Sequence, residues 1–156
     1  MPTSTSISAK MTSSVPGAAA SALVVGHADF ASGLVSAVDQ IGGCGDRFIA
    51  MSNRGLSLAD LETAIALQVA RGVRVVFTDL PAGSTTVAAR RVQRLHADLV
   101  VATGVSLAAL LDFALGAGVG TIGAHAAAQQ AIDKGRAAMQ VVQGPPAASA
   151  GATRGA

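Results

Sequence analysis

The stretch ALVVGHADFASG (residues 22–33) joins a continuous apolar run, a histidine and the start of an amphipathic segment. We expect residues 21–26 to form a buried strand, because a parallel strand covered by helices on both faces is apolar along its whole length. Residues 29–41 are expected to form a helix, with Leu34, Val38 and Ile41 on one face. His27 then lies at the carboxyl end of a buried strand, where a titratable ring contributes little to the packing of the core.

The same alternation of strand and helix continues along the chain. Further strands are expected at 48–51, 73–78 and 98–102, and further helices at 58–70, 85–95, 107–115 and 124–135. Ser57, with Asp60 three residues later, predicts a capping box at the start of the second helix, and Ser106 predicts a cap for the fourth. The pattern predicts an α/β fold: a doubly wound, mainly parallel sheet of strand order 2-1-3-4, with helices on both faces.

The length of 156 residues and a hydrophobic content of 51% suit one domain with a substantial core. We expect a disordered leader at 1–20, which is rich in Ser, Thr and Ala and contains Met11 as an alternative start. The folded domain is expected at 21–143. Residues 144–156 are expected to form a low-complexity tail of Ala, Pro and Gly.

Composition excludes several classes of function. The net charge is only +2, no Lys/Arg stripe is present, and Trp and Tyr are absent, so we expect no nucleic-acid partner. No apolar run reaches the roughly 18 residues that span a bilayer, so we expect no membrane insertion and a cytoplasmic location. The single cysteine, Cys44, excludes an internal disulfide and a cysteine zinc cluster; we interpret it as a small residue in a turn.

Glycine motifs do not indicate a nucleotide cofactor. The glycines of GVGTIG (118–123) have dinucleotide-motif spacing, but they follow an expected helix rather than a strand. A phosphate-binding loop with the GK[ST] pattern is absent, and no acidic cluster for Mg²⁺ is evident. We therefore expect no cofactor and no metal.

His27 is the candidate catalytic residue among three histidines. His96 and His125 are placed at helix ends, where a structural role is the simpler interpretation. From position alone a structural role is also favoured for His27, but Asp79 directly follows the third expected strand. In strand order 2-1-3-4 both residues emerge at the switch point of the sheet, where ligands bind. A carboxylate beside an imidazole orients the ring and leaves its other nitrogen free as a nucleophile.

The segment LPAGSTTVAARR (80–91) adds a candidate anion site at the same edge. Pro81 and Gly83 predict a tight turn, and Ser84 or Thr85 is expected to cap the following helix. Helix N-termini offer free N–H groups to anions, so we assign Gly83, Ser84 and Thr85 to phosphate binding. With Asp79 orienting it, His27 is expected to accept and donate a phosphoryl group as a carrier.

At these residues the chain resembles the IIA component of the mannose-type sugar phosphotransferase system. The resemblance covers nearly all of 22–143 and rests on four segments in the family's order: GHADFASGLVSAVDQIGG (26–43), FTDLPAGSTTVAARR (77–91), ATGVSLAALLDFAL (102–115) and AIDKGRAAMQVV (131–142). Many mannose-type members have Gly-Gly-Ser-Pro where this chain has Ala82-Gly83-Ser84-Thr85. The DLPAGS segment is more similar to the galactosamine and N-acetylgalactosamine branch.

The resemblance implies a phosphotransferase with a phosphohistidine intermediate. It implies that His27 accepts the phosphoryl group from phospho-HPr, the histidine carrier protein, and passes it to a IIB component for sugar uptake. The membrane components IIC and IID take part indirectly. The resemblance also places Asp79 as the residue that orients the histidine and Ser84 on the phosphate side. It implies a homodimer that swaps a short C-terminal edge strand, at the position of MQVV (139–142).

Two alternative functions remain open from the sequence. The phosphoryl-donor subunit of a dihydroxyacetone kinase resembles IIA around the histidine and would deliver the phosphoryl group to a different acceptor. A regulatory module would keep the phosphorylation of His27 and report it to a partner, without net flux to sugar. The sequence does not discriminate among sugars or IIB partners.

Overall fold

The computed structural model describes residues 21–116 and 119–146, which form one parallel sheet of four strands. The strands are β1 (Ala22–Gly26), β2 (Phe48–Ser52), β3 (Val75–Thr78) and β4 (Val100–Thr103). They lie in the order β2-β1-β3-β4, and Ala22 pairs with Phe48 on one side and with Val75 on the other. The strand order predicted from the sequence is confirmed.

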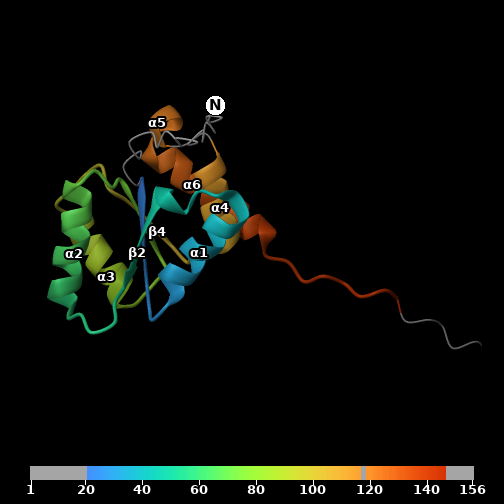
Figure 1. The fold of residues 1–156 in the computed structure, drawn as a ribbon, viewed down its shortest axis with the longest axis horizontal. Helices are drawn as coiled ribbons and strands as arrows, with labels where there is room; N and C mark the ends of the chain where they lie inside the picture. Colours follow the sequence, from blue (N-terminus) through green and yellow to red (C-terminus); the bar gives the residue numbers. More distant parts are fainter. Residues whose placement is uncertain (1–20, 117–118, 147–156) are drawn as a thin grey trace, which may run out of the picture.

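Helices cover both faces of the sheet (Figure 1). One face packs against α1 (Phe30–Gly42), α4 (Leu107–Leu115) and α6 (Ala124–Ala138), and the other against α2 (Leu58–Ala70) and α3 (Ser84–Gln93). Two short elements complete the described chain: the 3₁₀ turn η1 (Gly45–Arg47) and α5 (Val119–Ile122). The doubly wound architecture is therefore confirmed.

Strand β1 is the centre of two hydrophobic clusters. Ala22 and Val24 belong to the cluster beneath α1, α4 and α6, whereas Leu23 and Val25 belong to the cluster beneath α2 and α3, and all four side chains are 0% exposed. This division follows from the alternation of side chains along a strand. The burial explains why β1 is apolar along its whole length. It also fixes the position of His27, which directly follows the strand.

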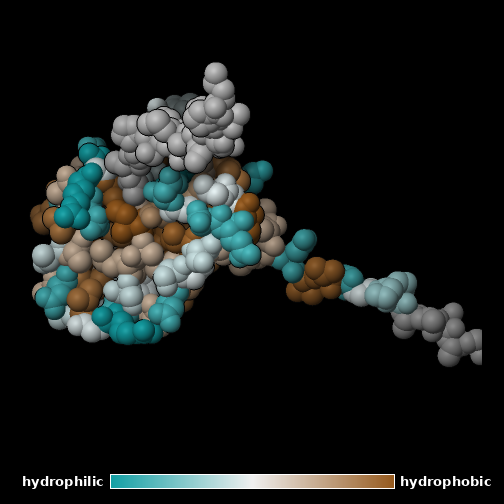
Figure 2. Space-filling view, viewed as in Figure 1, coloured by the Kyte–Doolittle hydropathy of each residue, from teal (hydrophilic) through white to brown (hydrophobic). Residues whose placement is uncertain are grey.

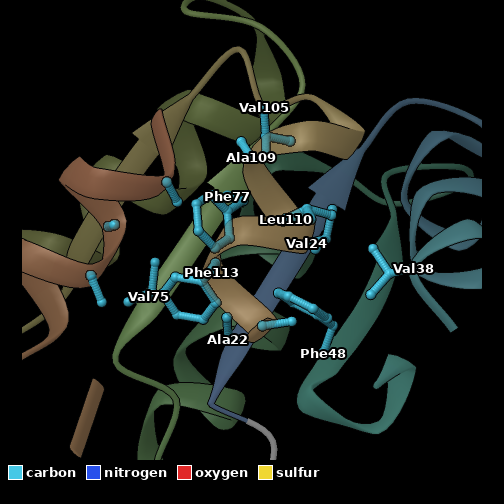
Figure 3. Packing of buried hydrophobic residues seen from close by; sticks show 14 of the residues in the cluster. Ala22, Val24, Val38, Phe48, Val75, Phe77, Val105, Ala109, Leu110 and Phe113 are labelled. Atoms are coloured by element: carbon cyan, nitrogen blue, oxygen red, sulfur yellow. The ribbon is translucent and has the colours of Figure 1, made fainter. Parts of the chain in front are cut away.

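Aromatic packing adds to the cluster on the α1, α4 and α6 side. Phe77 of β3 contacts Phe113 of α4 edge to face, with ring centroids 5.0 Å apart and ring planes at 84° (Figure 3). Such pairs contribute about 0.5–1.5 kcal/mol beyond the burial of their area. The contact holds the centre of β3 firmly, one residue before its polar carboxyl end begins.

The predicted caps of two helices are confirmed. The side chain of Ser57 accepts from the Asp60 N–H, and the Asp60 carboxylate accepts from the Ser57 N–H, which is the reciprocal capping box at α2. The side chain of Ser106 accepts from the Ala109 N–H at the start of α4. The predicted bounds of α2 and α4 match the structure, and the two caps explain where these helices begin, because each cap makes its bonds within one turn.

Other boundaries differ from the prediction. Strand β3 begins at Val75 rather than at 73, because the Val73 N–H bonds to the carbonyl of Gln68 and closes the turn after α2. Helix α6 is longer than predicted, and α5 was not predicted at all. A helix of four residues is too short to produce a periodic signal. The expected leader at 1–20, Gly118 of the glycine motif and the end of the tail at 147–156 lie outside the described residues.

Residues 139–142 form no strand within the single chain. They continue from α6 as an extended segment, in which Met139, Val141 and Val142 are 76%, 84% and 83% exposed. Figure 2 displays this segment leaving the body of the molecule with hydrophobic atoms on its surface. A strand needs a hydrogen-bonding neighbour, which the single chain does not place beside these residues, so the swapped edge strand stays a prediction. Within the described ranges, no helix has the length and apolar character to cross a membrane.

Candidate active site

His27 and Asp79 lie side by side at the carboxyl edge of the sheet, as the sequence predicts. His27 follows β1 and Asp79 follows β3, and these strands are neighbours. The His27 Nδ1 is 2.6 Å from Asp79 Oδ2, and the His27 backbone N–H donates to the same oxygen at 2.9 Å. These two contacts hold both the backbone and the ring of the histidine against one carboxylate.

The Asp79 carboxylate accepts four hydrogen bonds, and its side chain is only 8% exposed. Besides the two from His27, the Leu80 N–H donates to Oδ1 at 3.1 Å and the Thr85 hydroxyl donates to Oδ1 at 2.9 Å. Burial, the largest single influence, raises the pKa of Asp79, but the hydrogen bonds from His27 and Thr85 together outweigh it and hold the pKa below its ordinary value. Asp79 is therefore a carboxylate near neutral pH.

This hydrogen bonding determines the tautomer of a neutral His27 ring. A carboxylate only accepts hydrogen bonds, so the proton of the neutral imidazole is on Nδ1 and the lone pair is on Nε2. The His27 side chain is 48% exposed. The arrangement presents an oriented nucleophilic nitrogen at an accessible edge of the sheet.

The turn before α3 passes close to the His27 ring. Gly83 has φ +130°, a conformation that favours glycine, and a Cβ added there would lie 3.6 Å from His27 Cε1. Gly83 occupies the N-cap position of α3 and provides no side-chain bond. The prediction that Ser84 or Thr85 caps this helix is therefore wrong, because their hydroxyl groups bond to other partners.

Thr85 and Ser84 have different surroundings. Thr85 is fully buried and its hydroxyl donates to Asp79, so it holds the carboxylate in place from behind the site. Ser84 is exposed, and its Oγ accepts from Asn53 Nδ2 at 3.3 Å. Of the residues assigned to phosphate binding from the sequence, Gly83 lies beside the His27 ring, Ser84 is exposed at the start of α3, and Thr85 is buried against Asp79.

Asn53 is a site residue that the sequence analysis missed. It directly follows β2, its backbone N–H donates to the Gly26 carbonyl, and its side chain reaches Ser84. Arg54 beside it forms an exposed ion pair with Asp29 at 3.5 Å. Like His27 and Asp79, Asn53 is a polar residue directly after one of three neighbouring parallel strands, and this position was the signal in the sequence that could have identified it.

The remaining sequence candidates lie away from this edge. Cys44 is buried between α1 and η1. His125 is near the start of α6 and lines a groove of about 860 Å³ along β4, which does not include His27. The groove borders the open edge of the sheet, since β4 has β3 as a neighbour on one side alone among the described strands.

No protein-family model matches the sequence, and no curated protein matches it. Several solved structures share its fold at low sequence identity, including three phosphotransferase system proteins. A phosphotransferase system component EIIA from Streptococcus agalactiae is 18% identical with a TM-score of 0.68, over 77% of this chain and 95% of that one. A mannose/sorbose specific IIA subunit from Enterococcus faecalis is 17% identical with a TM-score of 0.68, over 80% and 95%.

The third, a IIA protein associated with the fucose utilization operon of Streptococcus pneumoniae, is 17% identical with a TM-score of 0.63. The match covers 77% of this chain and 90% of that one. Each match covers at least 90% of the neighbour and more than three quarters of this chain. The chain has the α/β fold of these phosphotransferase IIA proteins.

Proposed function

We propose that the protein is a phosphohistidine carrier of a sugar phosphotransferase system. His27 accepts a phosphoryl group from phospho-HPr and passes it to a IIB component for sugar uptake. The membrane components IIC and IID take part indirectly. The observation that supports this most directly is the His27 ring, which is held at Nδ1 by the Asp79 carboxylate and has a side chain that is 48% exposed. The resemblance of the motifs and the shared fold of IIA proteins agree with it.

The proposed transfer needs no proton acceptor at the site. The Nε2 lone pair of neutral His27 forms a bond to phosphorus, while the bond between phosphorus and the donor nitrogen breaks and its electron pair returns to the donor. The proton on Nδ1 stays in its hydrogen bond to Asp79, whose negative charge offsets the positive charge that develops on the ring. Transfer to the acceptor reverses these changes and restores the neutral ring.

Groups of the turn before α3 stabilise the phosphoryl oxygens in this proposal. Gly83 borders the ring, and Ser84 follows it at the N-terminus of a helix of ten residues, where backbone N–H groups favour an anion. Thr85 takes a different role from the one first assigned, because its hydroxyl is committed to Asp79. We assign Thr85 to positioning the carboxylate and Ser84 to contacting the phosphoryl group.

We also propose that the protein is a homodimer in which residues 139–142 of each copy add a strand to the other. The segment is apolar and exposed, and among the described strands β4 has a neighbour on one side alone, beside the groove of about 860 Å³. Pairing would bury the exposed side chains and satisfy the free backbone groups of both strands. Size-exclusion chromatography with light scattering measures the oligomeric state directly.

Labelling with the upstream proteins tests the carrier function. The protein is incubated with phosphoenolpyruvate, enzyme I and HPr, and the acid-labile phosphate is located by mass spectrometry. We expect one phosphoryl group on His27 and none on His27→Ala. His125→Ala is the matched control, because His125 is also an exposed histidine but lies in the groove at β4. A labelled His27→Ala protein contradicts the proposal.

The acceptor distinguishes the carrier from the two alternatives. Transfer from phospho-His27 to a IIB protein supports uptake, whereas transfer to the ADP site of a dihydroxyacetone kinase supports the donor-subunit alternative. Phosphorylation with no onward transfer supports a regulatory module. Because the DLPAGS segment is similar to the galactosamine and N-acetylgalactosamine branch, IIB proteins of that branch are the first acceptors to test. Function with these partners implies a cytoplasmic location.

A further inference from the structure

We propose that Asn53 is a positioning residue for phosphoryl transfer, acting through the hydroxyl group of Ser84; this inference rests on the proposed carrier function. Asn53 directly follows β2, and its backbone N–H donates to the carbonyl of Gly26, the residue before His27, at 3.1 Å. Its side-chain Nδ2 donates to Ser84 Oγ at 3.3 Å. One residue therefore joins the strand end that bears the histidine to the start of α3.

The direction of the hydrogen bond between Asn53 and Ser84 decides what the hydroxyl does. A serine hydroxyl has one proton to donate and two lone pairs that accept. The amide Nδ2 only donates, so it occupies a lone pair of Ser84 Oγ and leaves the hydroxyl proton available. A phosphoryl group at neutral pH has oxygens that accept hydrogen bonds. Asn53 thereby sets Ser84 as a donor toward the phosphoryl group.

The place of Ser84 makes this donor useful. Gly83, the residue before it, borders the His27 ring at Cε1, the atom between the two ring nitrogens. Asp79 occupies the Nδ1 side, so the phosphoryl group is added on the Nε2 side. The Asn53 side chain has its hydrogen bond with Ser84 rather than with His27. Asn53 therefore acts on the reaction indirectly, which a mutant cycle can measure.

Phosphoramidate is the donor for this test, because a small phosphoryl donor needs no docking surface and reports on the site alone. The rate of His27 phosphorylation is measured for wild type, Asn53→Ala, Ser84→Ala and the double variant. We expect Ser84→Ala to be about 10-fold slower and Asn53→Ala about 5-fold slower, as the loss of one hydrogen bond implies. The double variant should match Ser84→Ala within about twofold, because the two residues act as one unit.

Asn53→Asp separates positioning from simple packing. A carboxylate would accept the hydroxyl proton of Ser84, turn it away from the phosphoryl group and add a negative charge beside it. We expect Asn53→Asp to be slower than Asn53→Ala, although aspartate resembles asparagine more closely in shape. The backbone bonds of Asn53 to Gly26 and from Leu56 do not use the side chain, so both variants should fold, which far-UV circular dichroism checks.

The outcomes separate this inference from the proposed function. If wild type is phosphorylated on His27 but Asn53→Ala reacts at the wild-type rate, the positioning role is refuted and the carrier function stands. Rate losses that multiply in the double variant also refute it, because the residues then act independently. If His27 of the wild type takes no phosphoryl group from either phosphoramidate or HPr, the proposed function fails and the inference fails with it.

Discussion

Replacing Asp79 with asparagine tests the centre of the site. The carboxylate accepts two hydrogen bonds at each oxygen, whereas an amide offers one oxygen and one NH₂ group. The NH₂ group then faces either the two nitrogens of His27 or the Leu80 N–H and the Thr85 hydroxyl. The hydroxyl can turn and the neutral ring can change tautomer to accept, but the backbone N–H of His27 or of Leu80 is left facing another donor.

The size of the effect follows from these bonds. A hydrogen bond to a charged acceptor contributes about 1.5–3 kcal/mol, and the contribution is smaller at the half-exposed His27 because solvent screens it. We expect Asp79→Asn to lower the free energy of unfolding by about 2–4 kcal/mol, a large part of the stability of a domain. It should also slow phosphorylation of His27 at least about 10-fold, because the ring loses its fixed orientation.

The stability difference should depend on pH in a definite direction. The pKa of Asp79 is lowered in the folded protein from an ordinary value of 3.8, so the unfolded state binds more protons between the two values. Its stabilising contribution is fully present above the ordinary pKa and is lost as the pH falls through the lowered one. The difference between wild type and Asp79→Asn should therefore shrink below about pH 4.

Urea unfolding followed by far-UV circular dichroism measures this difference, since the chain has no Trp or Tyr for fluorescence. Asp60→Asn is the matched control. The pKa of Asp60 is also lowered, by hydrogen bonds from Ser57, but Asp60 is exposed on α2 and should leave phosphorylation unchanged. Equal unfolding midpoints for wild type and Asp79→Asn at neutral pH would refute the reasoning, and so would a difference that does not change on acidification.

Three further predictions concern other parts of the molecule. Gly26→Ala should destabilise the protein by about 1–3 kcal/mol, because its Cβ would lie 2.6 Å from Phe30 Cδ1. Gly33→Ala should instead stabilise α1 by about 0.5–1 kcal/mol, because no neighbouring element comes within 4 Å of its Cβ. Urea unfolding compares the two variants. Ser106→Ala should cost about 0.5–2 kcal/mol by removing the cap of α4, which the thermal midpoint measures; an unchanged midpoint contradicts this. A chain that ends at Ala138 should keep the monomer's stability but fail to dimerise, and a dimer of this chain in light scattering would exclude the proposed strand exchange.

The topology could be predicted from the sequence because short segments indicate which strands are buried on both faces and which helices cover them. A continuous apolar run such as 22–26 has to be covered on both faces, and each amphipathic segment after it supplies a cover. Parallel order then brings the carboxyl ends of β1 and β3 together, so the meeting of His27 and Asp79 follows from the pattern. The capping box at Ser57 was equally predictable, because both partners lie within one turn.

The sequence did not predict the partners of Ser84 and Thr85. A hydroxyl group at the start of a helix normally bonds within its own first turn, and this local rule suggested a cap. In the structure the hydroxyl of Thr85 reaches back to Asp79, and that of Ser84 accepts from Asn53, thirty-one positions away. Such bonds depend on the three-dimensional positions of the strand ends, which no spacing along the chain specifies.

The open edge of β4 also has a consequence for the solubility of the protein. Edge strands usually carry Lys, Pro or a bulge that prevents unwanted pairing. The sequence of β4 is Val-Val-Ala-Thr, which contains neither Lys nor Pro. In a single copy of the chain, an extended apolar peptide could therefore pair with the edge of β4 and start aggregation. At equal concentration, a chain that ends at Ala138, which lacks the proposed partner strand for β4, should therefore aggregate faster on heating than the full chain.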